Sequence, residues 1–103
     1  MADSYRVFYS PRAASELQKI FDYITEHSPA NAPGFLRQII DSIDSLEQFP
    51  HRHPVDDLIK SKRGQVRVLV VSPYLILYQI EETQRAVQLI SVRHGARRRP
   101  RRL

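Results

Sequence analysis

Residues 65–93, QVRVLVVSPYLILYQIEETQRAVQLISVR, decide the fold of this chain. They contain three runs of β-branched and aromatic side chains, separated by short breaks at Ser72-Pro73 and at residues 81–84. Runs of this kind are typical of consecutive antiparallel strands, so the stretch predicts a β-meander. Each run is apolar on both sides, as in strands that lie in mid-sheet or under a cover. The pattern leaves open which face packs on the rest of the chain.

Upstream of the meander, the sequence predicts a short strand and a first helix. The alternating, aromatic run Tyr5–Tyr9 is typical of a strand. Ser10 can cap a helix, and Pro11 suits the first helical position, where its missing N–H is no loss. Apolar residues then recur at helical spacing, which predicts a helix over residues 11–27.

A second apolar stripe predicts a second helix, which ends at Phe49-Pro50. Its start is open between Ser28 and Asn31 as the cap. A start at Ser28 would place Pro33 inside the helix, where proline removes a backbone hydrogen bond. A start at Asn31 keeps Pro33 in the first turn and avoids this loss, so the sequence favours Asn31 as the cap. The whole order predicts an α+β domain, with an N-terminal strand and a two-helix hairpin packed on an antiparallel β-meander.

Length and charge suggest one domain with a basic tail. We expect a single core over residues 1–96 and a tail over residues 97–103, which contains five arginines and no acid. Residues 1–96 contain eleven basic and eleven acidic residues. Such a tail is typical either of a contact with nucleic acid, a ribosome or an acidic protein, or of a solvated end. Without a signal-peptide core or a membrane-length apolar run, we expect a cytoplasmic protein.

The histidines of residues 51–53 invite a metal interpretation. Zinc takes three or four protein ligands, yet the other histidines, His27 and His94, are distant in sequence. Arg52 would also repel a cation bound between His51 and His53. We therefore expect loop histidines at the surface, and neither a metal nor a cofactor.

Other catalytic patterns are also absent from the sequence. There is no cysteine, no glycine-rich phosphate loop and no serine triad motif. Asp41, Asp44 and Glu47 share one side of the second predicted helix, but a paired-carboxylate site would need one of them buried. They have no apolar neighbours on that side, so we expect a solvated helix face.

Arg67, Arg93 and His94 are the better candidates for chemistry. Arg67 interrupts an apolar strand, where a charge should meet solvent or an anion. Arginines can hold a phosphate and a histidine can move a proton, and both are parts that an RNase needs. The alternative is that all three are exposed at the surface of the sheet without a catalytic role.

Several short motifs follow one another along most of the chain. The N-terminal motifs are Ser10-Pro11 with Ala13 and Ala14, then Tyr23-Ile24 followed by Ser28-Pro29. The C-terminal motifs are residues 74–78, YLILY, and residues 90–97, ISVRHGAR. In their order and spacing, rather than in any single motif, they resemble the ParE branch of the RelE/ParE toxin superfamily. This resemblance implies a small toxin with two helices on an antiparallel sheet, as the pattern already predicts.

The resemblance also implies a cognate antitoxin, ParD-like or another small antitoxin, that wraps and neutralises the toxin. Its flexible segment would gain affinity from apolar contacts, from strand addition and from acids paired with arginines. The residues that we expect to bind the antitoxin or the target are Arg67, Tyr74, Tyr78, Arg93, Arg97 and Arg98. Apolar strands that the helices leave uncovered would give such a partner a surface to cover.

The superfamily divides by target. ParE-like members poison DNA gyrase without accepted catalytic residues, whereas RelE-like members cut mRNA on the ribosome. Arg67, Arg93 and His94 fall near the positions of the RNase residues, but no tyrosine follows His94. The sequence therefore favours a gyrase-directed toxin over an mRNA endoribonuclease. A non-toxic module that binds nucleic acid through the tail is a third interpretation.

Overall fold

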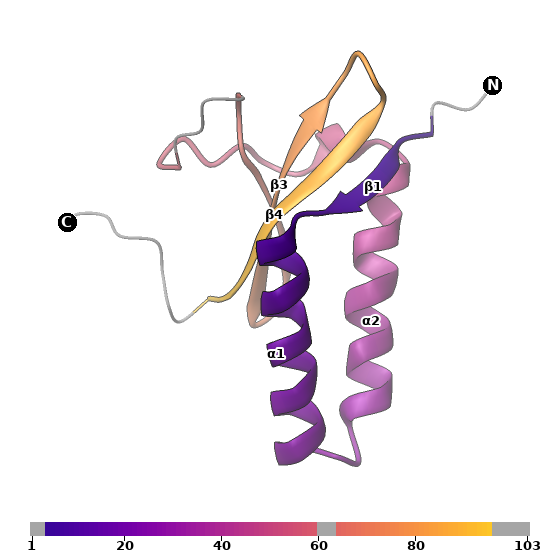
Figure 1. Ribbon diagram of the computed structural model, residues 1–103, viewed down its shortest axis with the longest axis vertical. Coiled ribbons are helices and arrows are strands. Elements are labelled where there is room, and N and C mark those ends of the chain that lie inside the picture. The colour runs from indigo at the N-terminus through magenta and orange to yellow at the C-terminus, as the bar shows by residue number, and fades with distance from the viewer. Residues whose placement is uncertain (1–3, 60–63, 96–103) are drawn as a thin grey trace.

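The computed structural model describes residues 4–59 and 64–95. The predicted domain end at residue 96 and the predicted tail, residues 97–103, lie outside this part of the chain. The helices and strands follow the predicted order (Figure 1). They are β1 (Arg6–Tyr9), α1 (Pro11–His27), α2 (Ala32–Asp44), β2 (Arg67–Val71), β3 (Tyr74–Glu81) and β4 (Ala86–His94), with 3-10 turns at Ser45–Glu47 and Pro50–Arg52.

The four strands form one mixed sheet in the order β1-β4-β3-β2. Strands β2, β3 and β4 are antiparallel neighbours, which confirms the predicted meander. Strand β1 lies parallel to β4, and its pairing ends where Tyr9 lies opposite Leu89. A β-bulge interrupts the register between β3 and β4 at Leu77 and Tyr78. Bulges bend a strand and increase its twist, and this one lies just before the end of β4 that β1 does not reach.

Both helices begin where the sequence predicts. The Ser10 side chain accepts a hydrogen bond from Ala13 N at 3.0 Å, which caps α1 ahead of Pro11. Asn31 precedes α2, as predicted, but its side chain makes no capping hydrogen bond. Figure 1 shows the two helices antiparallel and side by side, joined by a short connection. No helix within the described residues is both long and apolar enough to cross a lipid bilayer.

The main core lies between this helix pair and one face of the sheet. It includes Ala13, Leu17 and Ile24 of α1, Ile39 and Ile43 of α2, and Leu69, Ile76, Tyr78, Val87 and Leu89 of the sheet. A second, smaller cluster lies on the opposite face, where Val66, Val68 and Leu77 pack with the loop residue Ile59. Cover on both faces explains why the strands are apolar on both sides. The cover is incomplete on the outer face, since Val70 is 60% exposed.

Candidate functional site

Helix α1 takes the place of a neighbouring strand beside the last part of β4. Ser10 N donates to Leu89 O at 3.1 Å, and the Ser10 hydroxyl donates to Ile90 O at 3.1 Å. Farther along, Val92 N donates to the Glu16 carboxylate at 2.9 Å. Buried backbone donors and acceptors need partners, so these contacts satisfy a strand edge that β1 leaves open.

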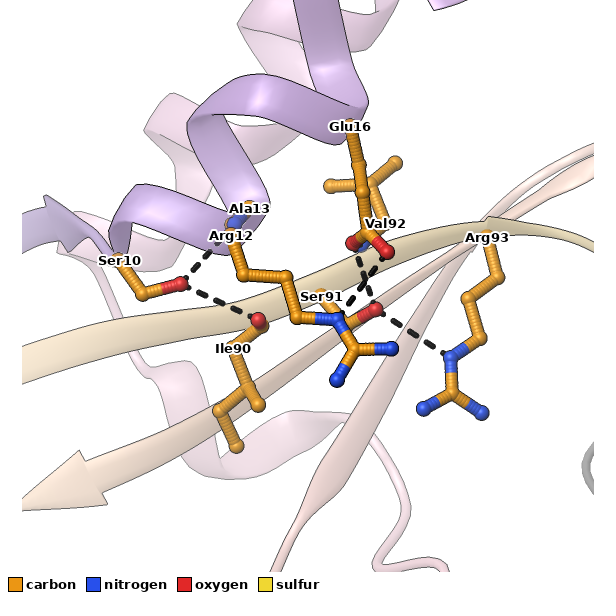
Figure 2. Close-up of polar contacts among 8 residues, drawn as sticks. All are labelled: Ser10, Arg12, Ala13, Glu16, Ile90, Ser91, Val92 and Arg93. Atoms are coloured by element: carbon orange, nitrogen blue, oxygen red, sulfur yellow. Dashed lines mark hydrogen bonds and ion pairs between the residues drawn. The ribbon is translucent and has the colours of Figure 1, made fainter.

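Glu16 is the centre of this arrangement (Figure 2). One carboxylate oxygen accepts hydrogen bonds from Ser91 Oγ at 2.7 Å and Val92 N at 2.9 Å, and the other lies 3.2 Å from Arg12 Nε. Burial alone would raise the pKa of Glu16. The hydrogen bonds from Ser91, Val92 and Arg12 outweigh burial, so the pKa lies below its ordinary value. Glu16 is therefore an ionised carboxylate, held in place, at neutral pH.

A groove of about 790 Å³ opens beside this network, between α1 and the end of β4. Helix α1 contributes Arg12, Glu16, Lys19, Ile20 and Tyr23. The sheet contributes Tyr74, Val92, Arg93 and His94. The groove thus combines apolar and aromatic side chains with several cationic ones.

The groove holds more positive than negative groups. Arg12, Lys19 and Arg93 face a single carboxylate, that of Glu16. Arg93 Nε donates to Ser91 Oγ at 3.3 Å, so it is tied to the Glu16 network through the serine. The His94 ring meets Tyr74 edge to face, with the ring centroids 5.3 Å apart. Anionic groups with an apolar neighbour are the natural ligands of such a surface.

The structure brings only part of the predicted site together. Arg93, His94 and Tyr74 line the groove, as one group. Arg67 on β2 lies opposite Tyr78 on β3, and Arg93 on β4 lies opposite Leu75 on β3. Leu75 and Tyr78 are three residues apart along β3. Three residues along a strand and two strand spacings across the sheet put the two arginine Cα atoms roughly 14 Å apart. The three candidate RNase residues therefore do not converge through their backbone positions.

Arg67 has a structural role in this fold. Its guanidinium donates through one nitrogen to His51 O at 3.0 Å and to His53 O at 2.7 Å. The loop backbone also pairs with β2, through Val68 N to Pro54 O at 3.0 Å. Arg67 is half-buried, and the loop carbonyl oxygens occupy one of its guanidinium nitrogens, a contact that the sequence did not predict.

Tyr78 is a further correction. Its side chain has no exposed surface, and its hydroxyl donates to Pro50 O. Burial raises its pKa to about 12, although Arg67 and Arg52 lower it in part. The prediction that Tyr78 contacts a partner is wrong, because helices and loop cover it. The other two predicted contact residues, Arg97 and Arg98, lie outside the described residues.

The remaining sequence candidates stay at the surface or form no site. Asp41, Asp44 and Glu47 are exposed, as expected for a solvated helix face. Within residues 4–59 and 64–95, no group of three or more metal-binding side chains is close enough to hold an ion. His51 is exposed, as predicted, and its ring pairs with the Glu82 carboxylate. His53 is only half-exposed, and its Nε2 is buried without a hydrogen-bond partner among the described residues.

Sequence reasoning missed the α1 side of the groove. Arg12, Glu16, Lys19 and Tyr23 recur every three or four residues, so one ridge of α1 carries them. That spacing shows that they share a side, but not that the side lies against β4. Ser91 gave a weak signal, as a polar residue within an apolar strand, and it proves fully buried.

Comparisons with known proteins agree with this architecture. The model of the family described as the ParE toxin of the type II toxin–antitoxin system, parDE, matches residues 7–99. Toxin RelE2 of Caulobacter vibrioides is 29% identical over 92 residues, which are 89% of this chain and 97% of that protein. Both similarities extend over most of the chain.

Two solved structures share the fold. A chain of the chromosomal ParDE toxin–antitoxin system from P. aeruginosa has a TM-score of 0.69 at 16% identity, covering 90% of this chain and 98% of that one. A chain of the RelBE2 toxin–antitoxin complex from Mycobacterium tuberculosis has a TM-score of 0.63 at 18% identity, covering 88% and 98%. These likenesses define the class, a small α+β fold found in toxin–antitoxin complexes. By the family match, the chain belongs to the ParE toxin family of type II toxin–antitoxin systems.

Proposed function

We propose that this toxin arrests bacterial growth by binding DNA gyrase, without catalysing a reaction, and that a cognate antitoxin neutralises it in the cytoplasm. The separation of the candidate RNase residues is the observation that carries this proposal. Arg67 serves the loop at residues 51–53, whereas Arg93 and His94 line the groove beside α1. A nuclease centre needs its phosphate-binding and proton-transfer groups around one reacting bond.

A binding toxin needs a different kind of surface, and the groove supplies one. It combines the apolar Ile20 and Val92, the aromatic Tyr23 and Tyr74, and several cations. Such mixed surfaces suit a protein partner, with aromatic side chains as anchors and charges that set orientation. The antitoxin part of the proposal also draws on the two structural neighbours, which come from ParDE and RelBE toxin–antitoxin systems.

The test is a pair of in vitro reactions with the purified full chain. In the first, gyrase supercoils relaxed plasmid DNA, and cleavage complexes are trapped with detergent and protease. In the second, ribosomes translate a reporter mRNA whose integrity is followed by primer extension. We expect inhibited supercoiling with accumulated cleavage complexes, and intact mRNA. Normal supercoiling at a large molar excess of the chain would refute the gyrase proposal.

An mRNA endoribonuclease is the second candidate, and one specific contact favours it. Arg93 and His94 are consecutive residues that both line the groove, and the His94 ring packs on Tyr74. An arginine beside a histidine could stabilise a phosphate and transfer a proton. If this function is correct, the chain cuts mRNA on ribosomes, and His94→Ala abolishes the cuts. A His94→Ala variant that still arrests growth fully would exclude a mechanism that depends on this histidine.

A further inference from the structure

We propose that Ser91 is a positioning residue, whose buried hydroxyl directs the Arg93 guanidinium into the groove before the target of this toxin binds. The inference rests on the proposed function, a toxin that binds gyrase, and says how one cation of the groove is oriented. It gives a role to a serine with no exposed surface, a polar residue within an otherwise apolar strand.

The β-bulge places Ser91 and Arg93 on the same side of β4. Two consecutive residues of β3 pair with Leu89 and Ser91, which are two residues apart, so β4 holds one extra residue at the bulge. An extra residue moves the side chains after it to the opposite face of the strand. Figure 2 shows the Ser91 and Arg93 side chains on one side of the strand and Val92 on the other. The bulge thus puts the serine hydroxyl within reach of the arginine.

The carboxylate of Glu16 fixes the direction of the Ser91 hydroxyl. Ser91 Oγ donates its one proton to Glu16 at 2.7 Å. Burial raises the pKa of Glu16 but its hydrogen bonds lower it more, so the carboxylate is ionised at neutral pH and only accepts. With its proton used, the hydroxyl can only accept, and it accepts from Arg93 Nε at 3.3 Å. The direction set by the carboxylate therefore passes through the serine to the guanidinium.

The backbone on either side of Arg93 is also held. Val92 N donates to Glu16 at 2.9 Å, and Gly95 N donates to Pro73 O at 2.6 Å. A Cβ at residue 95 would lie 3.0 Å from Pro73 O, so glycine suits this close approach. Since the backbone around Arg93 is fixed, the freedom that remains is in its side chain, and the serine hydroxyl limits that freedom.

The described residues offer the Arg93 guanidinium no competing partner. Within residues 4–59 and 64–95, no carboxylate lies within ion-pair distance of it, and its terminal nitrogens make no hydrogen bond. A guanidinium that is held through Nε keeps its paired terminal donors in one direction. An arginine that is ordered in advance loses less freedom when a partner binds. The serine therefore prepares Arg93 for a contact without touching the partner itself.

NMR of the isotope-labelled full chain tests the orientation directly. The heteronuclear nuclear Overhauser effect (NOE) of Arg93 Nε is compared between the parent and Ser91→Ala. We expect it to fall in the variant to the value of Arg37, an exposed arginine on α2. Arg12 Nε lies 3.2 Å from Glu16 without the serine between them, so its NOE should be unchanged and serves as the internal control. An unchanged NOE of Arg93 Nε in Ser91→Ala would overturn the proposal.

A double-mutant cycle tests whether this orientation matters to the target. Inhibition of gyrase supercoiling is measured for Ser91→Ala, for Arg93→Ala and for the variant that carries both changes. Ser91→Ala alone should weaken inhibition by about three- to tenfold, because the arginine must then be ordered during binding. In the Arg93→Ala background the same change should have little further effect, because the serine acts through the arginine. Ser15→Ala changes an exposed serine on α1 and should inhibit as the parent does.

A purely structural role of the serine would give a different pattern. Ser91→Ala would then weaken inhibition equally in both backgrounds, and this result would overturn the proposal, as would parent-like inhibition by Ser91→Ala. Circular dichroism shows whether each variant is folded. If the parent itself left supercoiling unchanged, the gyrase proposal would fail, and the NMR comparison would still decide whether the serine orients Arg93. A chain that inhibits gyrase but whose Arg93 NOE ignores Ser91→Ala would refute this inference alone.

Discussion

The Glu16 network allows a sharp test of how α1 completes the sheet. In Glu16→Ala, the buried Ser91 hydroxyl and the Val92 N–H lose their acceptor. A buried donor left without a partner costs about 1–3 kcal/mol, and rotation of the serine hydroxyl recovers part of this. We expect a loss of about 2–3 kcal/mol in the free energy of unfolding. Glu16→Gln keeps an acceptor of the same shape and should lose about 1 kcal/mol.

The pH dependence distinguishes charge from shape. Because the pKa of Glu16 is lowered in the folded chain, the ionised carboxylate stabilises the fold above the ordinary glutamate pKa of 4.5. That contribution disappears as the pH falls through the lowered folded value. Glutamine cannot titrate, so the difference between the parent and Glu16→Gln should be largest near neutral pH. It should shrink steadily in acid below pH 4.5.

The assay is urea unfolding followed by circular dichroism, at neutral pH and through a series of acidic buffers. Glu26→Ala is the matched control, because Glu26 is an exposed glutamate on the same helix. A surface change of this kind should alter stability by about 0.5 kcal/mol or less. If Glu16→Ala proved as stable as Glu26→Ala, the carboxylate would not be completing the edge of β4. If the difference in unfolding free energy between the parent and Glu16→Gln stayed constant through the acid series, the charge of Glu16 would not be what stabilises the fold.

Three further predictions concern the loop and its neighbours. Tyr78→Phe removes the hydrogen bond to the buried Pro50 O and should cost about 1–2 kcal/mol in urea unfolding. Arg67→Ala removes both hydrogen bonds to the loop at residues 51–53, so the backbone amides of this loop should exchange hydrogen faster than in the parent. The pKa of Glu82 is lowered, first by the hydrogen bond from His51. In His51→Ala, carbon NMR of the Glu82 carboxyl should therefore show a higher pKa.

Control variants separate these effects from a general loss of stability. Tyr23→Phe removes a hydroxyl from a tyrosine that is 58% exposed, and it should leave stability within about 0.5 kcal/mol. Arg37→Ala should leave loop exchange unchanged. Parent-like exchange in Arg67→Ala, or an unchanged Glu82 titration in His51→Ala, would show that these contacts do not hold the loop in solution.

Local patterns were sufficient for most of the fold. Helix α1 spans the predicted residues because Ser10 and Pro11 mark its start and one apolar stripe runs along it. The meander follows from three apolar runs separated by breaks too short for anything but hairpins. The place of β1 was not predicted. It lies parallel to β4 at one end of the sheet, a pairing between residues about eighty positions apart that no local pattern encodes.

The candidate site was predicted in part. Arg93, His94 and Tyr74 meet at the groove because strand pairing places Tyr74 opposite His94. Arg67 and Tyr78 are also cross-strand partners, but they serve the loop at residues 50–53. Since these strands are apolar on both sides, alternation could not show which face would be covered. The face of the sheet on which a side chain lies therefore determines whether it lines the groove or bonds to the loop.

The sequence by itself determined the order of the elements and the start of both helices, because caps, prolines and hydrophobic periods act over a few residues. It did not predict the end of α2, which stops at Asp44 and continues as a 3-10 turn, short of the predicted end at Phe49-Pro50. It also determined the excess of basic groups and the resemblance that the family match confirms. Only the tertiary structure decided which of these groups work together. Glu16 joins Arg12 to Arg93 because β1 stops at Tyr9 and α1 then runs beside the open edge of β4. That arrangement depends on contacts between distant segments, which packing rather than local preference determines.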